Sequence, residues 1–301
     1  MKKDNNETSL RQQFEIDSSM KIGYISLNVS DIQTSLEFYQ SILGIRVLGR
    51  PSNNRALLSS NGNASHLVEL LRARDNDPTS RIIKGAGLYH FAILLPERKY
   101  LADMLMNLRE NPNKVHFDGL ADHLVSESIY IRDPDFNGIE IYRDRPTSEW
   151  NWKRGQIEMA TLRLNTDDML KESTEKGWSE MPAKTTIGHV HLHVRDLQKA
   201  MKYYHEISGL NLTTSYPGAY FFAAGRYHHH IATNTWLGTD IASASPESVG
   251  LNHFSIELPN KDAFTRSLRQ LSGYDLTVSD LSEGSVFVQD MDGIRIRLQH
   301  K

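Results

Sequence analysis

The apolar positions of this chain repeat one pattern four times. Short apolar segments occur at 21–27, 87–93, 186–192 and 250–256, and each is followed by polar residues. The fourth position of every segment holds a ring, and these four residues are Tyr24, His90, His189 and His253. A motif that returns at intervals of this size indicates repeated copies of one structural unit. The sequence therefore predicts four modules, each opening with a strand.

Within a module, the period of the apolar residues changes along the chain. In the first copy an apolar strand over 22–29 is followed by Asp31, and then by apolar residues at helical spacing over 32–40. Gly44 is expected to end this helix. Short alternating segments at 45–48, 55–59 and 67–71 then predict three strands. The unit is thus βαβββ, and the third copy repeats it with a helix over 197–207 that is followed by Gly209.

The repeats divide the chain into four segments. The predicted fold is α+β, with four βαβββ modules that form two open, barrel-like cups. The repeat is lost between the second and third modules, where one short helix near 167–176 is expected. We expect a disordered tail at 1–20, an N-terminal double module at 21–145, a linker at 146–185 and a C-terminal double module at 186–301.

Composition and charge narrow the class of protein. The 301 residues are 39% hydrophobic and 24% charged, as in a soluble globular protein. A net charge of −3 gives no electrostatic reason to expect a nucleic-acid partner. The polar segment at 1–20 resembles neither a signal peptide nor a membrane anchor. The absence of cysteine is compatible with a cytoplasmic location, and it restricts metal ligands to His, Asp and Glu.

Several motifs carry a resemblance to a known family. They are Gly-Leu-Tyr-His-Phe-Ala-Ile at 87–93, Asp-Pro-Asp-Phe-Asn-Gly-Ile-Glu-Ile-Tyr at 133–142, Gly-His-Val-His-Leu-His-Val at 188–194 and Tyr-His-His-His-Ile at 227–231. With the βαβββ repeat, they make the chain similar to the vicinal oxygen chelate superfamily of glyoxalases, bleomycin resistance proteins and extradiol dioxygenases. The presence of four modules and the sequences of these motifs resemble the catechol 2,3-dioxygenase branch of the superfamily. The resemblance implies a divalent metal held by the first and last strands of paired modules.

Three ligand sets follow from this resemblance. The set used by well-known extradiol enzymes maps to His189, His253 and Arg297, but arginine has no lone pair to offer a metal. The set used by glyoxalase I maps to the first two modules, with Glu69, His90 and Glu140, and has a tyrosine, at position 24, in the fourth place.

Pairing modules two and three instead gives the set His90, Glu140 and His189. Two histidines and one carboxylate are the ligands of non-haem Fe(II) oxygenases. We therefore predict this set as the metal ligands, with His253 as the main rival.

The resemblance also suggests residues that act on the substrate. His229 corresponds to the acid/base histidine, with His228 and His230 as alternatives in register. Tyr130 corresponds to a tyrosine that holds the reaction intermediate, and His123 to a further pocket histidine.

The expected function is Fe(II)-dependent extradiol cleavage of a catechol-type aromatic diol with O2, with Mn(II) as the alternative metal and a role in aromatic catabolism. A homo-oligomer is compatible with this expectation, whereas nucleic acid and membrane partners are not expected. Two other functions stay open: a glyoxalase I-like lyase or isomerase built on Glu69, His90 and Glu140, and a metal-free protein that binds a small aromatic compound or drug.

Overall fold

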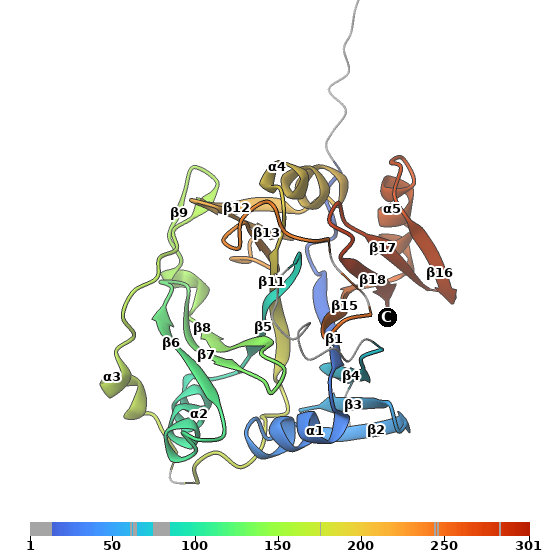
Figure 1. Ribbon diagram of the computed structural model, residues 1–301. Coiled ribbons are helices and arrows are strands. Elements are labelled where there is room, and N and C mark those ends of the chain that lie inside the picture. Colours follow the sequence, from blue (N-terminus) through green and yellow to red (C-terminus); the bar gives the residue numbers. More distant parts are fainter. Residues whose placement is uncertain are drawn as a thin grey trace, which may run out of the picture.

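The chain folds into two sheets that lie side by side and curve into open cups (Figure 1). Neither sheet closes into a barrel, which confirms the predicted α+β cup architecture. The part of the chain that the computed structural model describes comprises residues 14–60, 62, 65–74, 85–174, 176–243, 245, 247–282 and 284–301.

Within these described residues each sheet has eight strands. The first sheet has, in spatial order, β16 (Val278–Ser282), β17 (Ser285–Gln289), β18 (Arg295–His300), β15 (Gly250–Leu258), β1 (Lys21–Val29), β4 (Val68–Arg72), β3 (Arg55–Ser59) and β2 (Arg46–Ser52). The second sheet has β12 (Asn211–Tyr216), β13 (Ala219–Ala223), β14 (Ile231–Asn234), β11 (Thr186–His193), β5 (Gly87–Leu94), β8 (Gly138–Asp144), β7 (Ser126–Arg132) and β6 (His116–Asp122).

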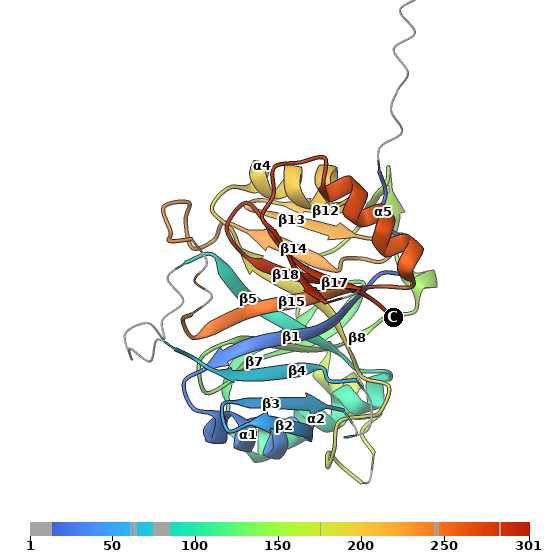
Figure 2. The ribbon, with the colours of Figure 1, turned by 90° about the vertical axis from the view of Figure 1, so that its right-hand side faces the viewer.

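Module pairing crosses the two halves of the sequence. The first strands of modules one and four, β1 and β15, pair antiparallel at the centre of the first sheet. The first strands of modules two and three, β5 and β11, do the same in the second sheet. The segments 21–145 and 186–301 therefore each contribute one module to each sheet. Figure 2 shows β1 and β15 next to one another in the middle of the first sheet.

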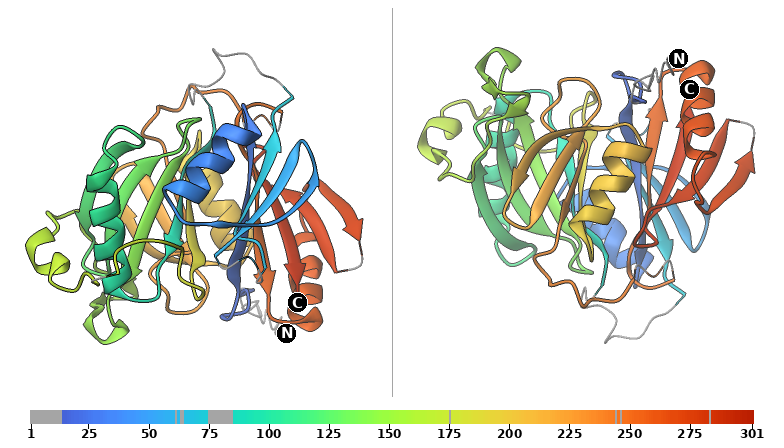
Figure 3. Two further views of the ribbon diagram at one scale, coloured as in Figure 1. Left: turned by 90° about the horizontal axis from the view of Figure 1, so that it is seen from below. Right: turned by 90° about the horizontal axis from the view of Figure 1, so that it is seen from above.

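Helices pack on the two ends of this pair of sheets (Figure 3). One side carries α1 (Ile32–Ser41) and α2 (Arg98–Glu110), and the opposite side carries α4 (Leu197–Ala200) and α5 (Lys261–Leu271). The Asp31 carboxylate accepts a bond from the Thr34 amide at 2.8 Å, so it caps α1 as predicted. The helix expected at 197–207 continues from α4 as a π-helix, Met201–Ile207.

Two tyrosine–aspartate bonds join the sheets. Tyr39 in module one donates to Asp133 in module two at 3.1 Å, and Tyr204 in module three donates to Asp290 in module four at 2.8 Å. Both tyrosines and both aspartates are buried. The two partners of each bond belong to modules whose strands lie in different sheets, so these repeated pairs connect the two modules within each half of the sequence.

Segments that are distant in the sequence pack closely against the two glycines that follow the equivalent helices of modules one and three. Gly44 and Gly209 have φ values of +67° and +76°, and a Cβ atom on either would meet another segment at 2.7 Å or less. Met181 donates to the Gly44 carbonyl, and Ile16 donates to the Gly209 carbonyl. Ile16 and Met20 are buried, so the tail predicted at 1–20 is wrong for residues 14–20; residues 1–13 lie outside the described part of the chain.

The segment between modules two and three is more ordered than a plain linker. It contains the one-turn 3-10 helix Thr147–Glu149, β9 (Trp152–Lys153), β10 (Gln156–Ile157) and α3 (Thr166–Leu170). The expected helix near 167–176 is thus present but shorter. None of the helices described is long and apolar enough to cross a membrane.

Candidate active site

Three central strands of the second sheet place His90, Glu140 and His189 on one face. In the paired register, Ala92 of β5 lies opposite both Glu140 of β8 and His189 of β11. Residues that are directly opposite one another share a face, and so do residues two apart on one strand. His90, two positions before Ala92, therefore points the same way. The small Ala92 side chain leaves the space between them to the three larger groups.

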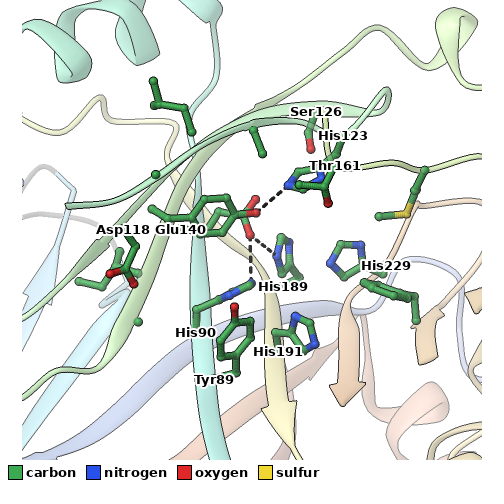
Figure 4. Close-up of a pocket in the computed structure, with 18 of the residues that line it drawn as sticks. Tyr89, His90, Asp118, His123, Ser126, Glu140, Thr161, His189, His191 and His229 are labelled. Atoms are coloured by element: carbon green, nitrogen blue, oxygen red, sulfur yellow. Dashed lines mark hydrogen bonds and ion pairs between the residues drawn. The ribbon is translucent and has the colours of Figure 1, made fainter. Parts of the chain in front are cut away.

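The three side chains converge on one point (Figure 4). The Nε2 atoms of His90 and His189 each lie 3.0 Å from the same oxygen, Oε2 of Glu140. Among the residues described, this is the group whose nitrogen and oxygen atoms could hold a metal ion, with all three within 4.8 Å of one another. All three side chains are buried, and the other Glu140 oxygen accepts a 2.6 Å hydrogen bond from Ser128.

Burial and mutual contact set the charge states of this group. Burial would raise the pKa of Glu140, but the charge and hydrogen bonds of His189 and His90 outweigh it and hold that pKa well below its usual range. Burial lowers the pKa of His189 to about 4, against the opposing effect of Glu140. At neutral pH the group thus offers an ionised carboxylate and a neutral His189 imidazole.

His229 lies beside this cluster and forms part of a histidine chain. Its ring centroid is 4.0 Å from that of His189, and its Nδ1 lies 2.7 Å from Nδ1 of His228. Burial, followed by the neighbouring histidines, lowers the pKa of His229 well below its ordinary value. Since His228 engages Nδ1, Nε2 is the ring nitrogen of His229 that is left for a ligand in the pocket.

Tyr130 and His123 form a hydrogen-bonded pair on the other side of the cluster. Tyr130 lies directly opposite Glu140 in the β7–β8 register. Nδ1 of His123 is 2.7 Å from the Ala160 carbonyl, which can only accept, so this nitrogen carries the proton. The Tyr130 hydroxyl therefore donates to Nε2 of His123, at 2.7 Å. Burial raises the pKa of Tyr130 well above 10, so the hydroxyl stays protonated at neutral pH.

A pocket of about 410 Å³ opens onto all six of these predicted site residues. Its volume is within the range of small-molecule sites. The walls are mostly apolar, and the rings of Tyr89 and Trp236 contact His191 while that of Phe221 contacts His229. Phe91 and Phe222, in contrast, are fully buried in the core.

Comparisons with known proteins agree with this fold. The family model of the Glyoxalase/Bleomycin resistance protein/Dioxygenase superfamily matches residues 21–141 and 186–298. The chain belongs to this superfamily. Over 247 residues, it is 36% identical to a catechol-2,3-dioxygenase of Bacillus subtilis, a match that covers 80% of this chain and 84% of that protein.

Solved structures of the superfamily share the fold. A putative dioxygenase from Bacillus subtilis superposes with a TM-score of 0.64 at 12% identity, covering 95% of this chain and 86% of that one. Glyoxalase I from Zea mays superposes with a TM-score of 0.56 at 14% identity, covering 94% and 92%. At these identities the likeness concerns the fold alone, and it includes superfamily members with different reactions.

The side chains of the two other ligand sets considered from the sequence do not come together at one point among the described residues. His253 belongs to β15 of the first sheet, where its Nε2 lies 3.0 Å from the Tyr24 hydroxyl. Arg297 donates to the same hydroxyl at 3.0 Å. In the first sheet, a cationic side chain therefore lies at the strand position that Glu140 has in the second sheet. Glu69 is in the first sheet as well and pairs with Arg55 at 2.7 Å. The combination of Glu69, His90 and Glu140 is therefore split between sheets.

The sequence analysis did not identify the residues that hydrogen-bond to the side chains of the candidate site. Ser128 lies two positions before Tyr130 and Asp144 four after Glu140, so strand alternation could have indicated both. Met159, Ala160 and Thr161 also line the pocket, although their segment was expected to be only a linker. That position could not be read locally, because it depends on how the segment packs on the second sheet.

Proposed function

We propose that this protein is an Fe(II)-dependent extradiol dioxygenase, which cleaves a catechol-type aromatic diol with O2. The observation that carries the proposal is the convergence of His90, Glu140 and His189 beside His229 and Tyr130 in one pocket. The resemblance to a catechol-2,3-dioxygenase over most of the chain supports it.

The donor set suits a divalent metal. Two imidazole nitrogens face one carboxylate oxygen, and this combination matches the ligands of non-haem Fe(II) oxygenases. His90, Glu140 and His189 would hold the metal, and Ser128 would keep the Glu140 carboxylate oriented. When bound, Fe(II) supplies a place where an aromatic diol and O2 meet and exchange electrons.

The side chains of the pocket supply binding and proton chemistry. Nε2 of His229 faces the ligand space and, as a neutral base, accepts a proton from a substrate hydroxyl. On the opposite side His123 orients the Tyr130 hydroxyl by accepting its hydrogen bond, and the Tyr130 oxygen accepts a hydrogen bond from a hydroxyl of the reacting molecule. The aromatic walls formed by Tyr89, Phe221 and Trp236 bind the ring and exclude water.

Anaerobic reconstitution tests this proposal. The purified protein is loaded with Fe(II), mixed with catechol or a substituted catechol, and exposed to air while O2 uptake and the yellow ring-opened product are followed. Stoichiometric uptake and product are expected. No uptake with a panel of catechols would refute the proposal. Turnover of a hemithioacetal with Zn(II) or Ni(II) would favour a lyase instead, and tight binding of aromatic compounds by metal-free protein would favour a sequestering role.

A further inference from the structure

A line of hydrogen bonds runs from the pocket to the protein surface behind His229. Nδ1 of His228 lies 2.7 Å from Nδ1 of His229, and Nε2 of His228 lies 2.9 Å from Oδ1 of Asp144. The other Asp144 oxygen accepts a bond from the Tyr227 hydroxyl at 3.0 Å. His228 is fully buried, whereas the Asp144 side chain is 23% exposed. This series of hydrogen bonds therefore begins at Asp144, which contacts solvent, and ends at His229 in the pocket.

The direction of these bonds follows from the chemistry of the groups. A carboxylate can only accept, so Nε2 of His228 must carry the proton that Asp144 receives. A His228 ring that carries its single proton on Nε2 has its lone pair on Nδ1. A lone pair at that nitrogen requires His229 to donate from its own Nδ1. His229 is left with an unprotonated Nε2 toward the pocket.

Packing also restricts the orientation of the His228 ring. The rings of Tyr227 and Trp150 both pack against His228, at 4.1 and 5.3 Å between centroids, and they also contact each other at 5.7 Å. Trp150 itself is buried and donates to the backbone carbonyls of Val125 and Arg145. The His228 ring cannot turn its nitrogens away without losing its contacts with these rings and its hydrogen bonds to Asp144 and His229. The orientation of His228 is therefore set by the fold.

We propose that Asp144 and His228 are positioning residues that hold His229 in the tautomer protonated at Nδ1, so that its Nε2 is a ready base in the pocket. The inference rests on the proposed function for the identity of the reaction, but the tautomer is a property of the protein without substrate. The oriented base of a catalytic triad follows the same physical logic, in which the wrong tautomer removes the base.

Nuclear magnetic resonance of histidine nitrogens tests the tautomer directly. The full chain, labelled with 15N-histidine, is measured both metal-free and loaded with diamagnetic Zn²⁺, and the signals are assigned by comparison with His228→Asn and His229→Gln variants. We expect His229 to be protonated at Nδ1 alone and His228 at Nε2 alone. A proton on Nε2 of His229, or on both nitrogens of His228, overturns the inference.

Substitution tests whether Asp144 controls this tautomer. Asp144→Ala removes the acceptor, so we expect His229 to become a mixture of tautomers and kcat with catechol to fall by about 10-fold or more, since general bases contribute about 10²- to 10⁴-fold. KM should change by less than about threefold, because a base acts mainly on the chemical step. An unchanged tautomer and kcat overturn the inference. Glu257→Gln is the control. This carboxylate is 21% exposed, similar to that of Asp144, and it forms an ion pair with Lys301, but it belongs to the first sheet, away from the pocket.

A double substitution separates positioning from simple loss of structure. In His228→Asn the carboxamide oxygen can accept from Nδ1 of His229 without help from Asp144. We therefore expect this variant to retain the His229 tautomer, and Asp144→Ala to cause no further loss of kcat in its background. Additive losses would overturn the inference. Catechol cleavage with the opposite tautomer overturns it while leaving the proposed function standing. The expected tautomer without catechol cleavage supports it and refutes only the proposed function.

Discussion

Removal of His189 and removal of His253 should have opposite consequences for metal binding. The two histidines occupy the same position in repeated strands and are similarly buried, at 1% and 5% exposure. His189→Ala removes one of the three converging side chains that could hold the metal, whereas His253→Ala removes a partner of Tyr24 in the other sheet. The pair therefore forms its own matched control, because each variant leaves a comparable cavity in a central strand.

The expected magnitude follows from the number of ligands. Structural zinc sites with four ligands gain about 10–16 kcal/mol, which corresponds to about 3 kcal/mol for each ligand. A loss of about 3 kcal/mol weakens binding by about 100-fold. We expect this loss of Zn²⁺ affinity for His189→Ala and less than about threefold change for His253→Ala, a difference well below 1 kcal/mol.

Competition with a chromophoric chelator measures these affinities, and elemental analysis measures the iron retained after gel filtration. Urea unfolding of both metal-free variants checks that each is folded to the same degree. If His253→Ala lost the metal and His189→Ala retained it, the assignment of the site to the second sheet would be wrong. Equal losses in both variants would indicate that the metal affinity depends on the fold rather than on these ligands.

Two further predictions concern the support of the site and the bonds between the sheets. Ser128→Ala should weaken Zn²⁺ binding by about 10- to 100-fold, because it removes the hydrogen bond to Glu140; Ser255→Ala, an equally buried serine of the first sheet, is the control, and equal effects would contradict the role of Ser128. Burial raises the pKa of Asp290 from 3.8 to about 6, so its protonated form stabilises the fold below about pH 4, and this contribution is lost as the pH rises through 6. Between pH 4 and 6.5 the wild-type free energy of unfolding in urea should therefore fall by about 2 kcal/mol relative to Asp290→Asn, which is most of the full effect at 1.36 kcal/mol per pKa unit, whereas parallel pH curves would show that this carboxyl is not perturbed.

Local patterns in the sequence predicted the elements well. The strand Arg55–Ser59 has the expected bounds, and the helix predicted over 32–40 is present as Ile32–Ser41. Both depend on neighbouring residues: alternation places side chains on two faces of a strand, and the Asp31 cap satisfies free amides at the start of the helix. The short strands Trp152–Lys153 and Gln156–Ile157 were not predicted, because they have too few residues to show a period.

The candidate site was predicted from exceptions within the repeat. Tyr24 and Arg297 made two of the three ligand sets incomplete, which left His90, Glu140 and His189. The structure brings these three side chains together, and their role as metal ligands stays a prediction. The supporting bonds of Ser128 and the chain through His228 to Asp144 went unnoticed, since each joins residues on separate strands.

The sequence by itself determined the four modules, the order of elements within each, and the residue types available to a metal. These properties come from local spacing, and a strand or helix period is readable wherever enough residues repeat it. Only the tertiary structure decided that modules two and three share a sheet, and that the segment after module two closes the pocket. Pairing between β5 and β11 joins residues about a hundred positions apart, and any of the four similar first strands could satisfy the same backbone hydrogen bonds. The choice among them depends on packing over the whole molecule, and that choice places His90 beside His189.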